Sequence, residues 1–126
     1  ARVHVIRRSL SALPGKAGAV AHSGLLLVTA SGQRSILEYG VDVGNGKRGT
    51  ALRPLGPDEP LDSVWTQQQL GAVPEGSYSA EDMKAIMESH AAKGAYDIHR
   101  HNCHLAQEAT RRAVGIHVDQ PYRPLW

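Results

Sequence analysis

A hairpin pattern in the first third of the chain constrains the fold more than any other feature. Residues 19–29 contain an aliphatic run at 25–28 that is typical of a buried strand. Residues 31–32, Ser-Gly, are a turn signal, and residues 34–39 can return as the second strand of an antiparallel hairpin. Residues 2–10 alternate in polarity and predict a further short strand. We therefore expect a small antiparallel sheet as one layer of the fold.

Two helices are expected in the second half of the chain. Ser79 suits an N-cap, and Asp82 lies three residues later, as in a capping box that precedes an apolar helical face. A second helix is expected from its N-cap Asn102 to the stop signal Gly115. Strands that are followed by helices predict an α+β fold, in which the sheet packs against the second helix.

The remaining segments are less regular. Residues 40–60 are rich in Gly and Pro and are interpreted as a long loop with at most short strand pieces. Residues 65–70 fit either a strand or a turn, and residues 11–18 are expected to form a loop. Residues 116–118 could form a last short strand. None of these segments indicates a boundary between domains.

Composition limits the domain count and the classes of partner. A chain of 126 residues suits one domain, 1–126, and 41% hydrophobic content without any Phe predicts an aliphatic core. The net charge of +2 is spread along the chain, which argues against nucleic acid as a partner. The longest apolar run, 25–28, is too short for stable membrane insertion, so we expect a soluble domain. Because the first residue is Ala rather than Met, we also expect a fragment processed or excised from a larger protein.

The only cysteine of the chain, Cys103, falls in the first turn of the second expected helix. Backbone N–H groups and the positive end of the helix dipole stabilise a thiolate there, which lowers the pKa of the thiol. A cysteine nucleophile also needs an imidazole nearby, and His22 at the start of the buried strand is the strongest candidate. Two structural alternatives stay open: Cys103 as a small buried apolar residue and His22 as a hydrogen-bonded strand residue.

The histidines around Cys103 allow a second interpretation. His99, His101, Cys103 and His104 could offer imidazole and thiolate ligands to zinc, or form a pH-responsive surface patch. Their spacing differs from the usual paired ligand patterns of zinc sites. We therefore expect no metal and no other cofactor, and a non-catalytic zinc- or protein-binding module remains an alternative.

The order of several short motifs resembles the circularly permuted papain-like superfamily of thiol enzymes. Within it, the motifs are most similar to those of the PPPDE group, the desumoylating isopeptidase-like thiol peptidases. They cover about residues 19–115 and comprise His22-Ser23-Gly24, Glu38-Tyr39-Gly40, Leu70-Gly71, Tyr96-Asp97-Ile98 and Asn102-Cys103-His104. One departure is clear: that group carries Asn and His after the cysteine, where this chain has His104 and Leu105.

The resemblance implies a permuted papain-like fold and a hydrolase that attacks an amide or isopeptide bond of a protein or peptide substrate. Cys103 would be the nucleophile and His22 its partner. Glu38 would orient the imidazole, although its position fits a solvent-facing strand residue equally well. The backbone N–H of Cys103 would be one oxyanion donor, and the candidates for the second are His101, Asn102 and Gln33.

Other members of the superfamily keep the order of His and Cys and differ in reaction. They include acyltransferases, thioesterases and deamidases, which are the alternative functions for this chain. Some members are bacterial toxin or effector domains. A chain of that kind would be secreted or delivered, and a cognate inhibitor or immunity protein would be among its partners.

Overall fold

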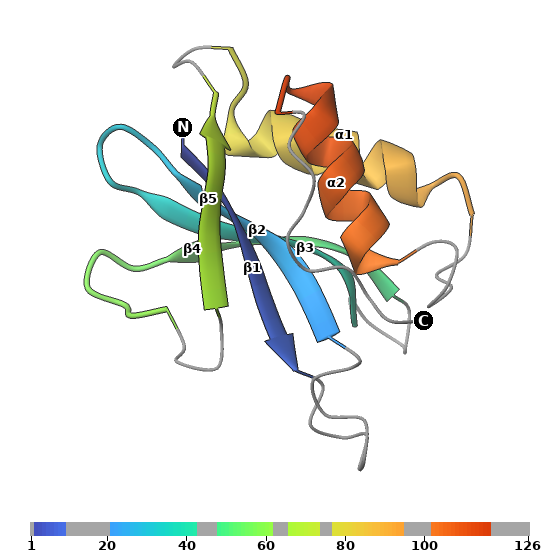
Figure 1. The fold of residues 1–126 in the computed structure, drawn as a ribbon, viewed down its shortest axis with the longest axis horizontal. Coiled ribbons are helices and arrows are strands. Elements are labelled where there is room, and N and C mark those ends of the chain that lie inside the picture. The colour runs from blue at the N-terminus through green and yellow to red at the C-terminus, as the bar shows by residue number, and fades with distance from the viewer. Residues whose placement is uncertain are drawn as a thin grey trace.

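A five-stranded antiparallel sheet forms one layer of the fold, and two helices lie against one of its faces (Figure 1). The computed structural model describes residues 2–9, 21–42, 48–61, 66–73, 77–94 and 102–116. The strands are β1 (Arg2–Ser9), β2 (Ala21–Val28), β3 (Arg34–Asp42), β4 (Arg48–Leu55) and β5 (Thr66–Ala72), and the helices are α1 (Ala80–Ala91) and α2 (Cys103–Ala113). The strand order is β4-β3-β2-β1-β5. The predicted α+β class, with an antiparallel sheet and the cysteine at the start of a helix, is confirmed.

The predicted hairpin lies at the centre of the sheet. β2 and β3 are paired from Leu25 opposite Leu37 to Val28 opposite Arg34. Gly32 in the connecting turn has φ 91°, a left-handed conformation that glycine adopts without the steric cost of a side chain. This register fixes which side chains of the two strands face the helices.

Alternate side chains of the hairpin enter two separate apolar clusters, as expected for a pleated strand. The cluster between the sheet and the helices consists of Leu25, Leu27, Leu37, Tyr39, Val73, Met83, Met87, Ala106 and Ile116. The cluster on the opposite face consists of Leu26, Val28, Ile36 and Leu55, with Leu61 packed against it. Tyr39 is the only aromatic residue among the members of the two described clusters, in keeping with a sequence that lacks Phe.

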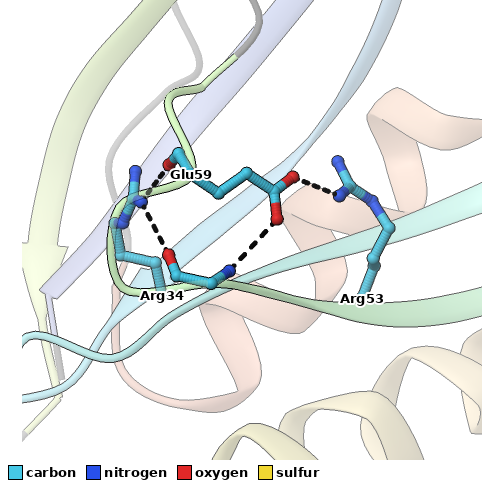
Figure 2. A network of polar contacts seen from close by, with 4 residues as sticks. Arg34, Arg53 and Glu59 are labelled. Carbon is cyan, nitrogen blue, oxygen red and sulfur yellow. Dashed lines mark hydrogen bonds and ion pairs between the residues drawn. The ribbon is translucent and has the colours of Figure 1, made fainter.

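A polar network holds the segment after β4 against the sheet (Figure 2). Arg34 donates hydrogen bonds from Nη2 to the carbonyl oxygens of Gly56, at 3.2 Å, and Glu59. The Glu59 carboxylate accepts from the Gly56 N–H at 3.1 Å and from Arg53 at 3.0 Å. These interactions, that of the Gly56 N–H first, hold the pKa of Glu59 below its ordinary value. The segment thereby folds back, and Leu61 packs against the second apolar cluster.

Both helices begin at the predicted N-caps. The Ser79 hydroxyl accepts from the Asp82 N–H at 3.0 Å, and the Asp82 carboxylate accepts from the Ser79 N–H at 2.9 Å, which completes the capping box. The Asn102 side chain accepts from the Leu105 N–H at 3.0 Å and caps α2. Gly115, with φ 92°, follows the end of α2 as the stop signal predicted.

The prediction of a long loop over residues 40–60 is wrong in its central part. β4 occupies Arg48–Leu55 and pairs with β3. It is an edge strand, where Pro54 is tolerated because one side of the strand needs no ladder hydrogen bonds. Residues 66–70 of the segment expected to be strand or turn lie in β5, and residue 65 lies outside the described residues. The loop expected at 11–18 and most of the short strand expected at 116–118 lie outside the described residues.

Neither of the two described helices could cross a lipid bilayer. The longer of them, α1, has 12 residues, whereas a spanning helix needs about 20 apolar ones.

Replacing Leu25 by alanine should lower the free energy of unfolding by about 2–5 kcal/mol, because the change empties space in the cluster between sheet and helices. Leu105→Ala removes the same atoms from a side chain that is 40% exposed and should cost only about 1 kcal/mol. Urea unfolding of both variants measures the difference. Equal losses of unfolding free energy in the two variants would contradict the placement of Leu25 in the core.

Candidate active site

Cys103, His22 and Glu38 meet where the start of α2 approaches β2 and β3. Cys103 is the first residue of α2, His22 is the second residue of β2, and Glu38 lies in the middle of β3. α2 packs on both strands, and Figure 1 shows its first turn close to the beginning of β2. Three elements that are distant in sequence thus bring a thiol, an imidazole and a carboxylate together.

Gly24 makes this approach of β2 and β3 possible. A Cβ atom at Gly24 would lie 2.9 Å from the backbone oxygen of Leu37 and 3.1 Å from Cγ of Glu38. Both distances are shorter than ordinary van der Waals contacts. A side chain at this position would therefore push β3, and with it the Glu38 carboxylate, away from His22.

The imidazole of His22 lies between a carboxylate and the thiol. Its Nε2 atom donates to Oε1 of Glu38 at 2.9 Å. Its side chain is also hydrogen-bonded to Cys103. Because Nε2 is engaged by Glu38, Nδ1 is the ring nitrogen that remains for the sulfur. The arrangement is a row of carboxylate, imidazole and thiol.

The pKa values of the pair move in opposite directions. Burial alone would raise the pKa of Cys103, but hydrogen bonds and charge from His104 and His22 outweigh it and lower the value to about 5. Burial alone would lower the pKa of His22, but the hydrogen bonds to Cys103 and Glu38 and their charges raise it to about 9. A thiolate–imidazolium pair is therefore favoured between about pH 5 and about pH 9.

Two further side chains lie at the site, and neither can be assigned to it from the sequence alone. Oγ of Ser23 is 2.7 Å from Nδ1 of His104, and the two residues are 0% and 1% exposed. His104 is also hydrogen-bonded to Cys103. In the sequence, His104 is a possible zinc ligand or surface histidine and the last residue of the motif Asn102-Cys103-His104, with no partner assigned to it. The signal that could have found the pair is Ser23 itself, because a polar side chain inside a buried strand needs a partner.

The three candidates for a second oxyanion donor have different positions. Asn102 is buried beside Cys103, where its side-chain oxygen caps α2. Gln33 is exposed at the turn between β2 and β3, at the opposite end of the hairpin from His22, so the structure does not bring it to the site. It lines a different cavity of about 480 Å³ beside the start of α1. His101 lies outside the described residues.

The described members of the proposed zinc cluster have other partners. Cys103 is hydrogen-bonded to His22 and His104, and His104 is hydrogen-bonded to Ser23. His99 and His101 lie outside the described residues. Within the part of the chain that the structure describes, no three His, Cys, Asp or Glu side chains are grouped as metal ligands.

Comparison with protein-family models, with curated proteins and with solved structures gave no significant match. The interpretation of the site therefore depends on the arrangement of its own side chains.

The thiol of Cys103 should titrate well below neutral pH, because the two imidazoles favour the thiolate. Since Cys103 is the only cysteine, the ultraviolet absorbance of the thiolate, with Cys103→Ser as reference, follows it directly. We expect a midpoint near pH 5. A midpoint near the ordinary value of about 8.5 would contradict the ion pair.

Gly24→Ala should separate Glu38 from His22. We expect the pKa of His22 to fall by about one unit or more, as expected for the loss of a hydrogen bond to a charged group. The stability should fall by about 1–3 kcal/mol through overpacking. NMR titration of His22 measures the first effect and urea unfolding the second.

Gly56→Ala is the matched control for this change, because a Cβ at Gly56 makes only ordinary contacts with Glu59. The control should leave the titration of His22 unchanged. An unchanged titration of His22 in folded Gly24→Ala would show that Gly24 does not control the contact with Glu38.

Proposed function

We propose that the chain is a cysteine-dependent hydrolase that cleaves an amide or isopeptide bond of a protein through Cys103 and His22. The observation that carries the proposal is the row of Glu38, His22 and Cys103 with the sulfur at the N-terminus of α2. A perturbed thiol, imidazole and carboxylate in contact are the parts that nucleophilic thiol catalysis requires. The antiparallel sheet, with its strand-borne His preceding the helix-borne Cys, also fits a permuted papain-like architecture.

In the first step, the Cys103 thiolate attacks the carbonyl carbon of the scissile bond. A carbon–sulfur bond forms, and the electron pair of the carbonyl π bond moves to the oxygen. Backbone N–H groups in the first turn of α2, that of Cys103 first, are donors for this oxyanion because they have no carbonyl partner within the helix. The positive end of the helix dipole favours the same negative charge.

In the second step, the tetrahedral intermediate collapses and the carbon–nitrogen bond breaks. The proton on Nδ1 of His22 passes to the leaving amine, and an acyl thioester remains on Cys103. His22 then takes a proton from water as the hydroxyl adds to the thioester carbon. The carbon–sulfur bond breaks, the acid product leaves, and the thiolate–imidazolium pair is restored.

Glu38 is a positioning residue in this scheme. It holds Nε2 of His22 at 2.9 Å, so the imidazole keeps the orientation in which Nδ1 faces the sulfur. Its negative charge also favours the protonated ring that the first step needs. Loss of the carboxylate should therefore slow turnover mainly through the protonation and orientation of His22.

Capture by an electrophile followed by a substrate screen tests the proposal. Peptides ending in a vinyl sulfone should modify Cys103, as read by intact mass, and peptide and lysine-isopeptide conjugates should be cleaved. Cys103→Ala should abolish both, and His22→Ala should lower kcat/KM by about 10²–10⁴-fold. Glu38→Gln should narrow the pH range of activity.

Ser35→Ala, on β3 away from the row, should retain wild-type activity. Cleavage of acyl esters or thioesters without cleavage of amides would overturn the amide assignment in favour of an acyl-transfer enzyme. Absence of both capture and cleavage, in protein whose fold is intact by circular dichroism, would overturn the hydrolase assignment.

A further inference from the structure

We propose that His104, oriented by Ser23, is a second imidazole that holds the Cys103 sulfur in place as a thiolate. This inference deepens the proposed function, which assigns proton transfer to His22 alone. It depends on the proposed hydrolase only for its consequence on turnover, because the ionisation of the thiol can be measured without a substrate.

The first argument is the geometry of a buried polar pair. Ser23 follows His22 on β2, and His104 follows Cys103 on α2, so the Ser23–His104 and His22–Cys103 contacts both join the start of β2 to the first turn of α2. Oγ of Ser23 lies 2.7 Å from Nδ1 of His104. This bond fixes the plane of the ring and engages Nδ1, which leaves Nε2 for the hydrogen bond with Cys103. Ser23 is thus a positioning residue for His104, as Glu38 is for His22.

The second argument is the charge around the sulfur. Among the elements that pack against α2, β2 carries the ionisable side chain His22 and β3 carries Glu38. The buried residues of α1 are the uncharged Met83 and Met87. The histidine of α1, His90, lies in the last turn of that helix. On α2 itself, the charged side chains have other partners: Arg112 donates a hydrogen bond to Glu108, and Arg111 donates one to Gln107 at 2.8 Å. Glu38 is engaged with His22. The side-chain donors that the described residues direct at the sulfur are therefore His22 and His104.

The third argument is a division of labour during turnover. His22 must give its proton to the leaving amine, so for the lifetime of the thioester it is a neutral acceptor. When water adds and the carbon–sulfur bond breaks, negative charge returns to the sulfur. His104 does not take part in the proton transfer, so its hydrogen bond remains available to the departing thiolate.

The test follows the thiol by ultraviolet absorbance in the absence of substrate. His104→Leu should raise the midpoint of the thiol titration by about one pH unit or more, as expected for loss of a hydrogen bond to a charged group. Ser23→Ala should raise it by less, because the ring remains but is no longer oriented. His104→Gln, which keeps an N–H donor at similar reach, should restore part of the shift. The double variant His22→Ala/His104→Leu should titrate near the ordinary value of about 8.5.

His90→Leu and Ser35→Ala are the matched controls and should leave the midpoint unchanged. A wild-type midpoint in folded His104→Leu would overturn the proposal. If that variant fails to fold, the proposal is decided by Ser23→Ala, whose midpoint must then move; an unmoved midpoint there would overturn it.

Turnover separates this inference from the proposed hydrolase. If a substrate is cleaved, His104→Leu should lower kcat several-fold with little change in KM. If no substrate is cleaved but the midpoint of the thiol titration shifts as described, the role of His104 as a second imidazole is supported and the hydrolase assignment is overturned.

Discussion

The buried ion pair between Cys103 and His22 is the interaction on which the arrangement of this region depends. Moving a thiolate and an imidazolium out of water costs several kcal/mol for each ion unless nearby groups compensate. The chain compensates from several sides: the first turn of α2 offers N–H groups and the helix dipole, Glu38 accepts from His22, and His104 donates to the sulfur. Each of these groups must be held rigidly, because the displacement of one partner would leave a buried charge without a compensating interaction, and the desolvation of that charge would then destabilise the fold.

Rigidity at the junction of α2 with β2 and β3 comes from three ordinary structural features. Asn102 caps α2 and so fixes where the helix begins, which places Cys103 in the first turn. Gly24 lets β3 approach β2 closely enough for Glu38 to reach His22. The apolar cluster between sheet and helices then presses α2 onto these strands. The site therefore depends on one cap, one glycine and one packed core.

Local sequence signals predicted most of the described secondary structure. The aliphatic run and turn of the hairpin, and the caps Ser79 and Asn102, act through neighbouring residues, so they could be recognised without the fold. β4 was missed because its stability comes from pairing with β3 and not from its own composition, which includes Gly49 and Pro54. Edge strands are the elements in which such residues are tolerated.

The site was predicted in part. The sequence itself predicts the pairing of Cys103 with His22, and the resemblance to permuted papain-like enzymes adds Glu38, whereas Gln33 lies at the far end of the hairpin. The contact between Ser23 and His104 joins residues 81 positions apart, and no local pattern encodes it. It requires the crossing of α2 over β2, which depends on the whole core.

A purely structural cysteine would need none of these groups. A thiol that only fills space is best served by apolar neighbours, since buried imidazoles and carboxylates stabilise a fold no more than well-packed hydrophobic side chains do. Here Cys103 is 3% exposed and has two imidazoles as partners, one of them bonded to a carboxylate and the other to a serine. Burying these polar groups lowers the stability of the fold, and its main effect is to change the ionisation of one atom, the sulfur. Because the fold gains no stability from the arrangement, the arrangement favours a chemical role for Cys103 over a packing role.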